Sequence, residues 1–436
     1  MKLLIKNGRV IDPLNGVDSL LDVLVEDGTI KGVAPEIESE NAVVIDASNK
    51  VIAPGLIDMH VHFRQPGRHE YKETIRTGSC AAAKGGFTTV VCEPNTVPPI
   101  DNAGKVKQVL DIARQMRIVN VYTKAAITRR LRGREVINIR KVVSQGAVAL
   151  TDDGFPVKEI DVMDEAAKEA RKYGIPICPH CEETRLRGRR EAKVSARYNS
   201  EAAYIDRDIH IVKDTRCSFH FPHVSLAKSV DYIAQAKKEG LPVTAEATPH
   251  HITLTEDDVK KIRPEANAKV NPPLRSAKDV EAIRQALQDN VIDVIATDHA
   301  PHAIYEKMSD NPPFGIIGLE TALGVVLTFL VHSGILTLSS VIEKLTVNPA
   351  RILNLKRGNL GIGMPADITI IDTNKEWVVD VNEFESKGRN CPFDEWKLKG
   401  KAVMTIVGGK VVMDEGKICD PPLEDPRLLQ QLKLPI

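Results

Sequence analysis

Two histidines one residue apart stand at the end of an apolar segment, and imidazoles at this spacing can bind a metal ion. His60 and His62 follow the mostly apolar residues 51–57. Because side chains along a β-strand alternate between its two faces, Asp58 and both histidines are predicted to point the same way. Two imidazoles side by side at a strand end make half of a metal site. Two surface histidines would look the same, so the rest of the chain must supply further ligands.

Further polar side chains follow apolar segments later in the chain, each where a predicted strand would end. They are Asn95, Asp152, Asp153, His180, His223 and Asp298. Each has an alternative structural role as a packed imidazole, a turn former or a helix cap. Together, imidazoles and carboxylates suit zinc, and a carboxylate can bridge two ions about 3.5–4 Å apart. Two zinc ions would lower the pKa of a water molecule and polarise a carbonyl, which is the chemistry of amide hydrolysis.

The middle of the chain alternates predicted strands with predicted helices. The strands are residues 56–62, 87–92, 119–126, 147–151, 175–180, 218–223, 243–247 and 292–297. Helical patterns between them include residues 73–84, 103–116, 162–173, 225–239 and 277–288. Eight such units predict an α/β fold of the (β/α)8 TIM-barrel type, whose catalytic groups lie at the carboxyl ends of its strands. A doubly wound open sheet is the alternative, but no Gly-x-Gly-x-x-Gly motif follows an early strand.

Both ends of the chain are rich in short predicted strands. Hairpin turns are predicted where turn dipeptides separate apolar runs, at Asn7-Gly8, Asp27-Gly28 and Gly408-Gly409. We therefore expect a small β-sandwich domain built from both termini, residues 1–54 plus 356–436, and a barrel formed by residues 55–355. Two separate β caps would fit the same pattern.

The composition is that of an ordinary globular protein. The 436 residues include 59 Lys or Arg and 59 Asp or Glu, and this balance does not favour nucleic-acid or membrane-surface binding. No apolar run reaches about 18 residues, and the short, charged N-terminus is unlike a signal peptide. We expect a cytoplasmic protein. The seven cysteines, an odd number, argue against a disulfide framework. Cys178 and Cys181 have the spacing of a redox motif, but we favour a metal-binding role for His180, which lies between them.

Eight short motifs run in order across nearly the whole chain. They are His-Val-His-Phe-Arg (60–64), Glu-Pro-Asn-Thr (93–96), Thr-Asp-Asp-Gly (151–154), Pro-His-Cys-Glu (179–182), Pro-His-Val-Ser (222–225), Asn-Pro-Pro-Leu-Arg (271–275), Thr-Asp-His-Ala-Pro-His (297–302) and Pro-Phe-Gly-Ile-Ile-Gly-Leu-Glu (313–320). In this combination the chain resembles a dihydroorotase of the amidohydrolase superfamily, from the bacterial class in which an aspartate bridges the metals in place of a carboxylated lysine. The resemblance implies the reversible closure of N-carbamoyl-L-aspartate to L-dihydroorotate in pyrimidine biosynthesis.

The resemblance also implies a role for each matching residue. One zinc would be held by His60, His62 and Asp298 and a second by His180 and His223, with Asp153 shared; one or two ions are expected, and two are favoured. Substrate contacts are implied for His62, Arg64, Asn95, Asn271, His302, Phe314 and Gly315, of which Arg64, Asn95 and His302 would surround the substrate carboxylate. Asp298 would also carry a proton from the attacking water to the departing nitrogen. Motif position alone favours Asp153 over Asp152 as the shared ligand.

Two other functions fit parts of the sequence. A hydantoinase or allantoinase would carry a lysine for carboxylation near the end of the fourth strand, and residues 147–153 contain none. A non-catalytic scaffold for aspartate transcarbamoylase would have lost metal ligands, and all six are present in this chain.

A small-molecule substrate is the expected partner, and we also expect a homo-oligomer. Docking of an active enzyme to aspartate transcarbamoylase stays open. The basic segment 185–197 is predicted to be a solvated loop, with a contact surface for a partner as the alternative.

Overall fold

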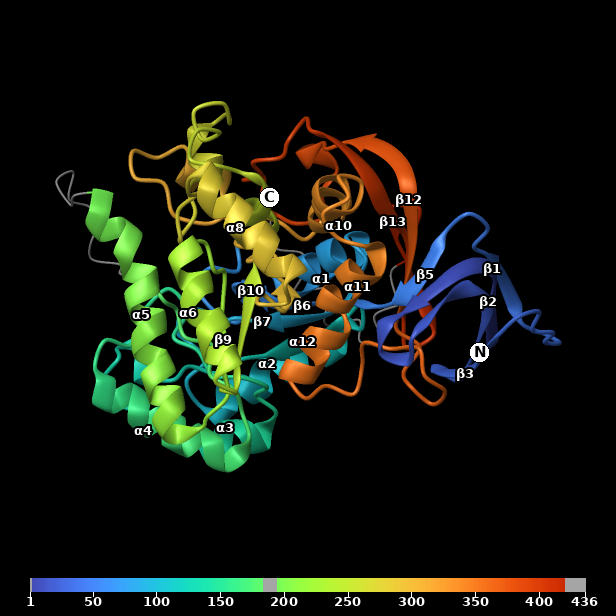
Figure 1. Ribbon diagram of the computed structural model, residues 1–436. Helices are drawn as coiled ribbons and strands as arrows, with labels where there is room; N and C mark the ends of the chain where they lie inside the picture. The colour runs from blue at the N-terminus through green and yellow to red at the C-terminus, as the bar shows by residue number, and fades with distance from the viewer. Residues whose placement is uncertain (1, 183–193, 420–436) are drawn as a thin grey trace.

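Figure 1 presents the protein as a computed structural model, which describes residues 2–182 and 194–419. Most of the basic segment 185–197 therefore lies outside the described residues. The strands are β1 (Lys2–Asp12), β2 (Val17–Glu26), β3 (Thr29–Ala34), β4 (Val43–Asp46), β5 (Val51–Pro54), β6 (Leu56–Val61), β7 (Phe87–Cys92), β8 (Asn120–Thr123), β9 (Phe219–Phe221), β10 (Val243–Ala247), β11 (Val294–Ile295), β12 (Ile368–Val378), β13 (Lys397–Val407), β14 (Lys410–Asp414) and β15 (Lys417–Ile418). The α-helices are α1 (Ile75–Lys84), α2 (Ala103–Met116), α3 (Ile139–Gln145), α4 (Ile160–Tyr173), α5 (Val194–Thr215), α6 (Ala227–Lys238), α7 (Pro249–Thr253), α8 (Ala277–Gln288), α9 (Ile304–Lys307), α10 (Ala322–Val326), α11 (Leu338–Leu345) and α12 (Val347–Ile352).

Parallel backbone segments from the middle of the chain close into a ring. β6, β7 and β8 pair side by side, and β9, β10 and β11 form a second parallel group. Single bridges complete the ring between these groups, at Ala125–Leu150, Leu150–Ile177, Ile177–Phe219 and Val61–His299. The predicted TIM barrel is therefore confirmed. A closed barrel brings the carboxyl ends of all its strands to one rim.

Several barrel segments pair over fewer residues than predicted, and residues 119–126 and 218–223 shorten to β8 and β9. Residues 147–151 and 175–180 form no named strand, and each joins its neighbours through one residue, Leu150 or Ile177. Residues 292–297 shorten to β11. An apolar run predicts burial, whereas a strand also needs successive hydrogen bonds to a neighbouring segment. The sequence pattern cannot indicate how many such hydrogen bonds form.

Strands from both ends of the chain form one nine-stranded sheet, ordered β15-β14-β13-β12-β5-β1-β2-β3, with β4 paired to β1. β5 is its junction, because it pairs parallel to β1 and antiparallel to β12. One apolar cluster contains Ile5 and Val25 from the N-terminal strands together with Ile370 and Ile406 from the C-terminal strands. Figure 1 shows β12 and β13 curving past β5 beside the barrel. The expected β domain from both termini is present, and its residue boundaries stay a prediction.

The predicted hairpin at Asn7-Gly8 is wrong. These residues lie inside the continuous strand β1, where the pairing with β2 shifts register between Ile5 and Gly8. The backbone N–H of Asn7 donates to Asp22 (3.0 Å) in β2, so the bulge is fastened to the neighbouring strand. A β-bulge and a hairpin turn both favour residues that tolerate positive φ, and Asn7 has φ 64°. The turns at Asp27-Gly28 and Gly408-Gly409 do join successive strands, as predicted.

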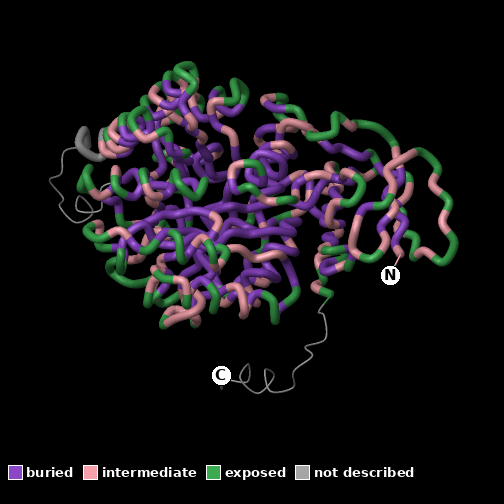
Figure 2. Tube along the Cα trace, turned by 90° about the horizontal axis from the view of Figure 1, so that it is seen from below, coloured by how far each residue is buried: buried purple, intermediate pink, exposed green. Residues whose placement is uncertain are grey.

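Helices cover the outside of the barrel (Figure 1). The predicted helices 103–116 and 277–288 coincide with α2 and α8, and α1, α4 and α6 begin and end within about two residues of prediction. Figure 2 shows buried backbone through the centre of the larger body, with exposed turns around it. Within the described residues, none of the helices combines the length and apolar character needed to cross a membrane.

Candidate active site

The first strand and the last strand of the barrel bring His60, His62 and Asp298 together. The carboxylate oxygen Oδ1 of Asp298 lies 3.0 Å from Nε2 of His62 and 3.5 Å from Nε2 of His60. The bridge between Val61 and His299 holds these two segments side by side, and the backbone N–H of His62 donates to the His299 carbonyl (2.8 Å). Closure of the barrel therefore brings residues that are more than 200 positions apart in sequence into contact.

The fourth, fifth and sixth segments contribute a second group of donors next to the first. Nδ1 of His180 lies 3.2 Å from Nε2 of His223 and 3.3 Å from Oδ1 of Asp153. Asp153 also approaches the first group, since Oδ1 is 3.7 Å from Nε2 of His60 and Oδ2 is 3.6 Å from Nε2 of His62. All six predicted metal ligands thus lie in one buried cluster, with Asp153 in contact with both halves.

Asp152 and Asp153 point in different directions. The carboxylate of Asp152 accepts hydrogen bonds from the backbone N–H groups of Ile127 (2.8 Å) and Thr128 (3.0 Å) and from the Thr128 hydroxyl. These contacts fasten the loop after β8 to the rim and leave Asp152 away from the histidines. The choice of Asp153 as the shared ligand, which rested on motif position, agrees with this placement.

A chain of buried polar groups supports His60. Its Nδ1 donates to Oε1 of Glu246 (2.6 Å) in β10, and the other carboxylate oxygen of Glu246 accepts from Nε2 of His220 (3.0 Å). Burial alone would raise the pKa of Glu246, but His60 and His220 hold it well below the usual range. Because its Nδ1 donates to Glu246, His60 turns Nε2 towards the cluster, and Nε2 would be the nitrogen that binds a metal ion.

The charges around His60 leave the cluster with more buried carboxylates than cations. Burial would lower the pKa of His60, but Glu93, Glu246 and Asp298 raise it to about 10. Burial likewise opposes ionisation of Asp298, yet His60 and His62 lower its pKa to about 2. Burying uncompensated carboxylates is costly, and a divalent cation would offset that cost.

The donor geometry fits zinc. Nε2 of His60 is buried without a hydrogen-bond partner, although three carboxylate oxygens lie 3.5–3.7 Å away. Ligands about 2.0–2.1 Å from a tetrahedral zinc lie about 3.3 Å from one another. The separations between donor atoms in both groups, 3.0–3.8 Å, are close to that value. The residues present therefore fit a metal centre of imidazole and carboxylate ligands.

Arg64 and Asn95 border the metal cluster. Burial lowers the pKa of Arg64 to about 10 against the opposing charges of Asp298 and Asp153. Among the described residues, Nε of Arg64 finds no hydrogen-bond partner. Asn95 is already engaged, because its amide donates to Asp153 (2.9 Å) and its carbonyl oxygen accepts from Nδ1 of His62 (2.9 Å). Arg64 is thus a half-buried cation whose buried Nε–H is unused, whereas Asn95 orients two predicted ligands.

The other predicted substrate contacts lie around the same rim and already have protein partners. The amide of Asn271 is 3.0 Å from Nε2 of His180. Nε2 of His302 donates to the Phe314 carbonyl (2.8 Å), and burial together with Arg64 lowers the pKa of His302 to about 2, so its ring is neutral. The Gly315 N–H donates to Lys269 (2.9 Å). Their roles toward a substrate stay predictions.

Sequence reasoning missed the buried residues that support the cluster. Glu246 stands inside the otherwise uncharged strand β10, and Lys124 forms a buried ion pair with Glu93 at the ends of β7 and β8. An acidic residue within a buried strand was the available signal. Both thiols of the Cys178–Cys181 pair are buried, and burial raises the pKa of Cys178 to about 12, which disfavours the reactive thiolate.

Comparison with known proteins places this fold and site in a family. The model of the Amidohydrolase family matches residues 51–412, and the chain belongs to that family, whose members depend on metal ions. Within it, the chain is a member of the dihydroorotases. It is 44% identical to a dihydroorotase of Elusimicrobium minutum over 96% of this chain and 99% of that protein. A dihydroorotase of Pelotomaculum thermopropionicum is 46% identical over 95% of this chain and 99% of its own length.

Solved structures show the same architecture. The L-hydantoinase of Arthrobacter aurescens superposes with a TM-score of 0.87 at 27% identity, covering 95% of this chain and 97% of that one. A D-hydantoinase from Thermus sp. gives a TM-score of 0.85 at 23% identity over 97% of both chains. The barrel together with its β domain is thus a shared fold.

Replacing Glu246 by Gln should weaken zinc binding about 10- to 100-fold, because outer carboxylates orient ligating histidines and increase their basicity. Competition with a chromogenic chelator measures this affinity. Glu239→Gln, at an exposed position after α6, is the matched control and should leave the affinity unchanged. Equal affinities in the two variants would contradict the supporting role of Glu246.

Proposed function

We propose that this chain is a zinc-dependent dihydroorotase, which closes N-carbamoyl-L-aspartate to L-dihydroorotate with loss of water and hydrolyses the ring amide in reverse. The assignment of this reaction rests on 42–46% sequence identity to proteins named dihydroorotase, over 95–96% of the chain. The buried donor cluster supports the metal dependence.

The ligands divide between two zinc ions. His60, His62 and Asp298 would hold one ion and His180 and His223 the other, with the Asp153 carboxylate shared. This division is supported by the position of Asp153, whose two oxygens face different histidines. Bound zinc supplies a water of lowered pKa and polarises the carbonyl that is attacked.

Asp298 moves the proton in this scheme. Its carboxylate is ionised, as the lowered pKa indicates, so it can accept a proton from the attacking water. It then delivers that proton to the ring nitrogen as the amide bond breaks. In the direction of ring closure the same carboxylate removes the proton from the attacking nitrogen.

Arg64 binds the carboxylate of the substrate. A guanidinium donates two parallel hydrogen bonds to a carboxylate, and burial strengthens such contacts by excluding water. The unused Nε of Arg64 beside the cluster supports this role. Asn95, Asn271, His302 and the backbone at Phe314 and Gly315 complete the pocket around the ring, with His62 at its metal side.

A hydantoinase activity is the second candidate, because the similar solved structures include hydantoinases. A neutral hydantoin has no carboxylate to pair with Arg64, and Asp153 stands where a carboxylated lysine would be expected. Assays of dihydroorotate, hydantoin and allantoin on one preparation with measured zinc content separate the candidates. Turnover of dihydroorotate alone, lost on chelation and restored by zinc, is expected; preferential turnover of hydantoin would overturn the proposal.

We also propose a cytoplasmic location and assembly into a homo-oligomer, with docking to aspartate transcarbamoylase as a further partner. These proposals rest on the family resemblance. Measuring turnover with and without that partner tests the last of them.

Asp298→Asn should lower kcat by about 10²–10⁴-fold or more, because the amide can neither accept the proton nor ligate as a carboxylate. Stopped assays in both directions of the reaction measure this loss, and circular dichroism checks the fold. Near-normal turnover would exclude Asp298 as the proton carrier.

Arg64→Ala should raise KM about tenfold or more for both substrates while changing kcat less, because the charge-assisted contact to the carboxylate is lost. Arg68→Ala, exposed on the same loop, is the control and should keep the KM of the parent protein. An unchanged KM in Arg64→Ala would refute the carboxylate contact.

A further inference from the structure

One surface segment carries a marked excess of basic residues, although the chain as a whole is electrically balanced. Residues 129–141 contain Arg129, Arg130, Arg132, Arg134, Arg140 and Lys141 against the single acid Glu135. The segment lies between β8 and the first turn of α3, which carries Arg140 and Lys141, and it is not part of the candidate active site. All six cations are exposed, so water and salt screen their mutual repulsion, and an anion bound among them would reduce it further.

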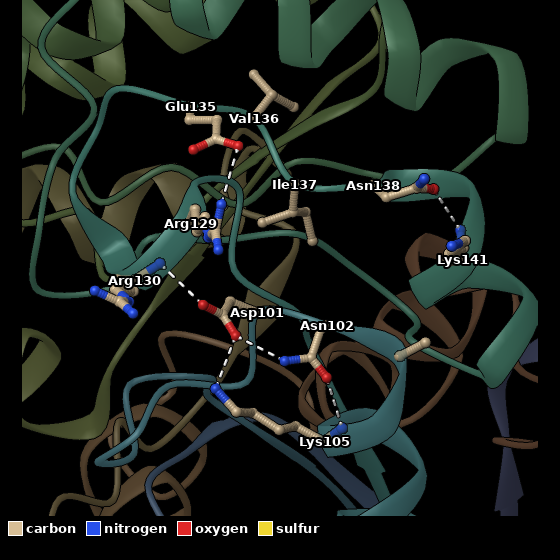
Figure 3. Close-up of a pocket in the computed structure, with 11 residues that line it drawn as sticks. Asp101, Asn102, Lys105, Arg129, Arg130, Glu135, Val136, Ile137, Asn138 and Lys141 are labelled. Carbon is tan, nitrogen blue, oxygen red and sulfur yellow. Dashed lines mark hydrogen bonds and ion pairs between the residues drawn. The ribbon is translucent and has the colours of Figure 1, made fainter.

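Part of this segment lines a cavity of about 460 Å³ beside the start of α2 (Figure 3). That volume lies within the roughly 300–1,000 Å³ of small-molecule sites. We call it the basic pocket, and its charged lining residues are Asp101, Lys105, Arg129, Arg130, Glu135 and Lys141. Val136 and Ile137 form an apolar wall. The lining thus combines four cations with two carboxylates.

The two carboxylates of the basic pocket are already paired. Asp101 accepts from Nζ of Lys105 (2.8 Å), and Glu135 pairs with Arg129 (3.5 Å), as Figure 3 shows. The side chains of Arg130 and Lys141 have neither hydrogen bonds nor ion pairs with any described residue. Two uncompensated cations therefore remain at one cavity.

The backbone around the basic pocket connects it to the candidate active site. The Arg130 N–H donates to Asp101 (3.0 Å), and the adjacent Thr128 donates to Asp152, the neighbour of Asp153. On the other side, the Ile100 N–H donates to the Pro94 carbonyl (2.9 Å), next to Asn95. A ligand that draws these two loops together would act on Asp153 and Asn95 through short rigid connections.

We propose that the basic pocket binds a small phosphorylated anion, and that its occupancy changes KM at the metal centre. A phosphate group matches free guanidinium and ammonium donors, and the apolar wall accommodates an attached organic group. The cavity is a recess of small-molecule size, which favours a small anion over an acidic protein surface.

Isothermal titration with inorganic phosphate and with ribose 5-phosphate, on the zinc-loaded protein at constant ionic strength, tests this proposal without depending on turnover. The double variant Arg130→Gln/Lys141→Gln should bind both probes about tenfold or more weakly than the parent. Arg132→Gln/Arg140→Gln removes the same charge from the same segment outside the cavity lining and should bind as the parent does. Tighter binding of ribose 5-phosphate than of phosphate would assign an organic phosphate as the natural ligand class, and equal binding would assign the free anion.

The proposal would be overturned if both double variants lost affinity for the probes equally, or if the parent protein showed no saturable binding. Either result would mean that the basic residues attract anions only through their overall charge and do not form a specific site. Dihydroorotate assays with and without saturating probe complete the test. A KM change that disappears in Arg130→Gln/Lys141→Gln supports the coupling, and an unchanged KM would refute it. Failure of the proposed dihydroorotase activity would leave the titration result intact.

Discussion

The burial of several carboxylates among imidazoles is the constraint on which the rest of this structure depends. Asp153, Asp298 and Glu246 lie in a space almost closed to water, where histidines and the Asn95 amide face them. Such an arrangement persists only if hydrogen bonds and a cation compensate the charge. This constraint also orients His60 and His62. Nδ1 of each ring donates to a fixed acceptor, Glu246 or Asn95, so that Nε2 faces the cluster.

The barrel is the scaffold that can meet this constraint. Its strands bring six donors from five separate segments to one rim, and the strand backbone limits how far each side chain can move. The sheet formed by both termini continues directly into the barrel, since β5 is separated from β6 by Gly55 alone. A Cβ at Gly55 would lie 2.1 Å from the Thr88 hydroxyl, so this junction requires glycine. The junction therefore fixes the start of the strand that carries His60 and His62.

Much of the site was predictable because its chemistry uses distinctive residues at strand ends. The histidine pair, the later histidines and Asp298 were all found from residue type and apolar pattern, and the family resemblance assigned them to two ions. The supporting residues were not found in this way. Glu246 and Lys124 act through partners from other strands, so a charged residue within a buried strand marks them as unusual without indicating which residues they support.

The sequence by itself determined which segments are buried, which residue types are available for chemistry, and hence the family. Strand periodicity and turn residues act over a few neighbouring positions, so these features can be read locally. Only the tertiary structure decided that Asp153 faces the histidines while Asp152 fastens a loop, and that Asn7-Gly8 is a bulge within a strand. Adjacent residues differ in the partners they meet across the fold, and those partners are set by long-range pairing and packing that no local pattern encodes.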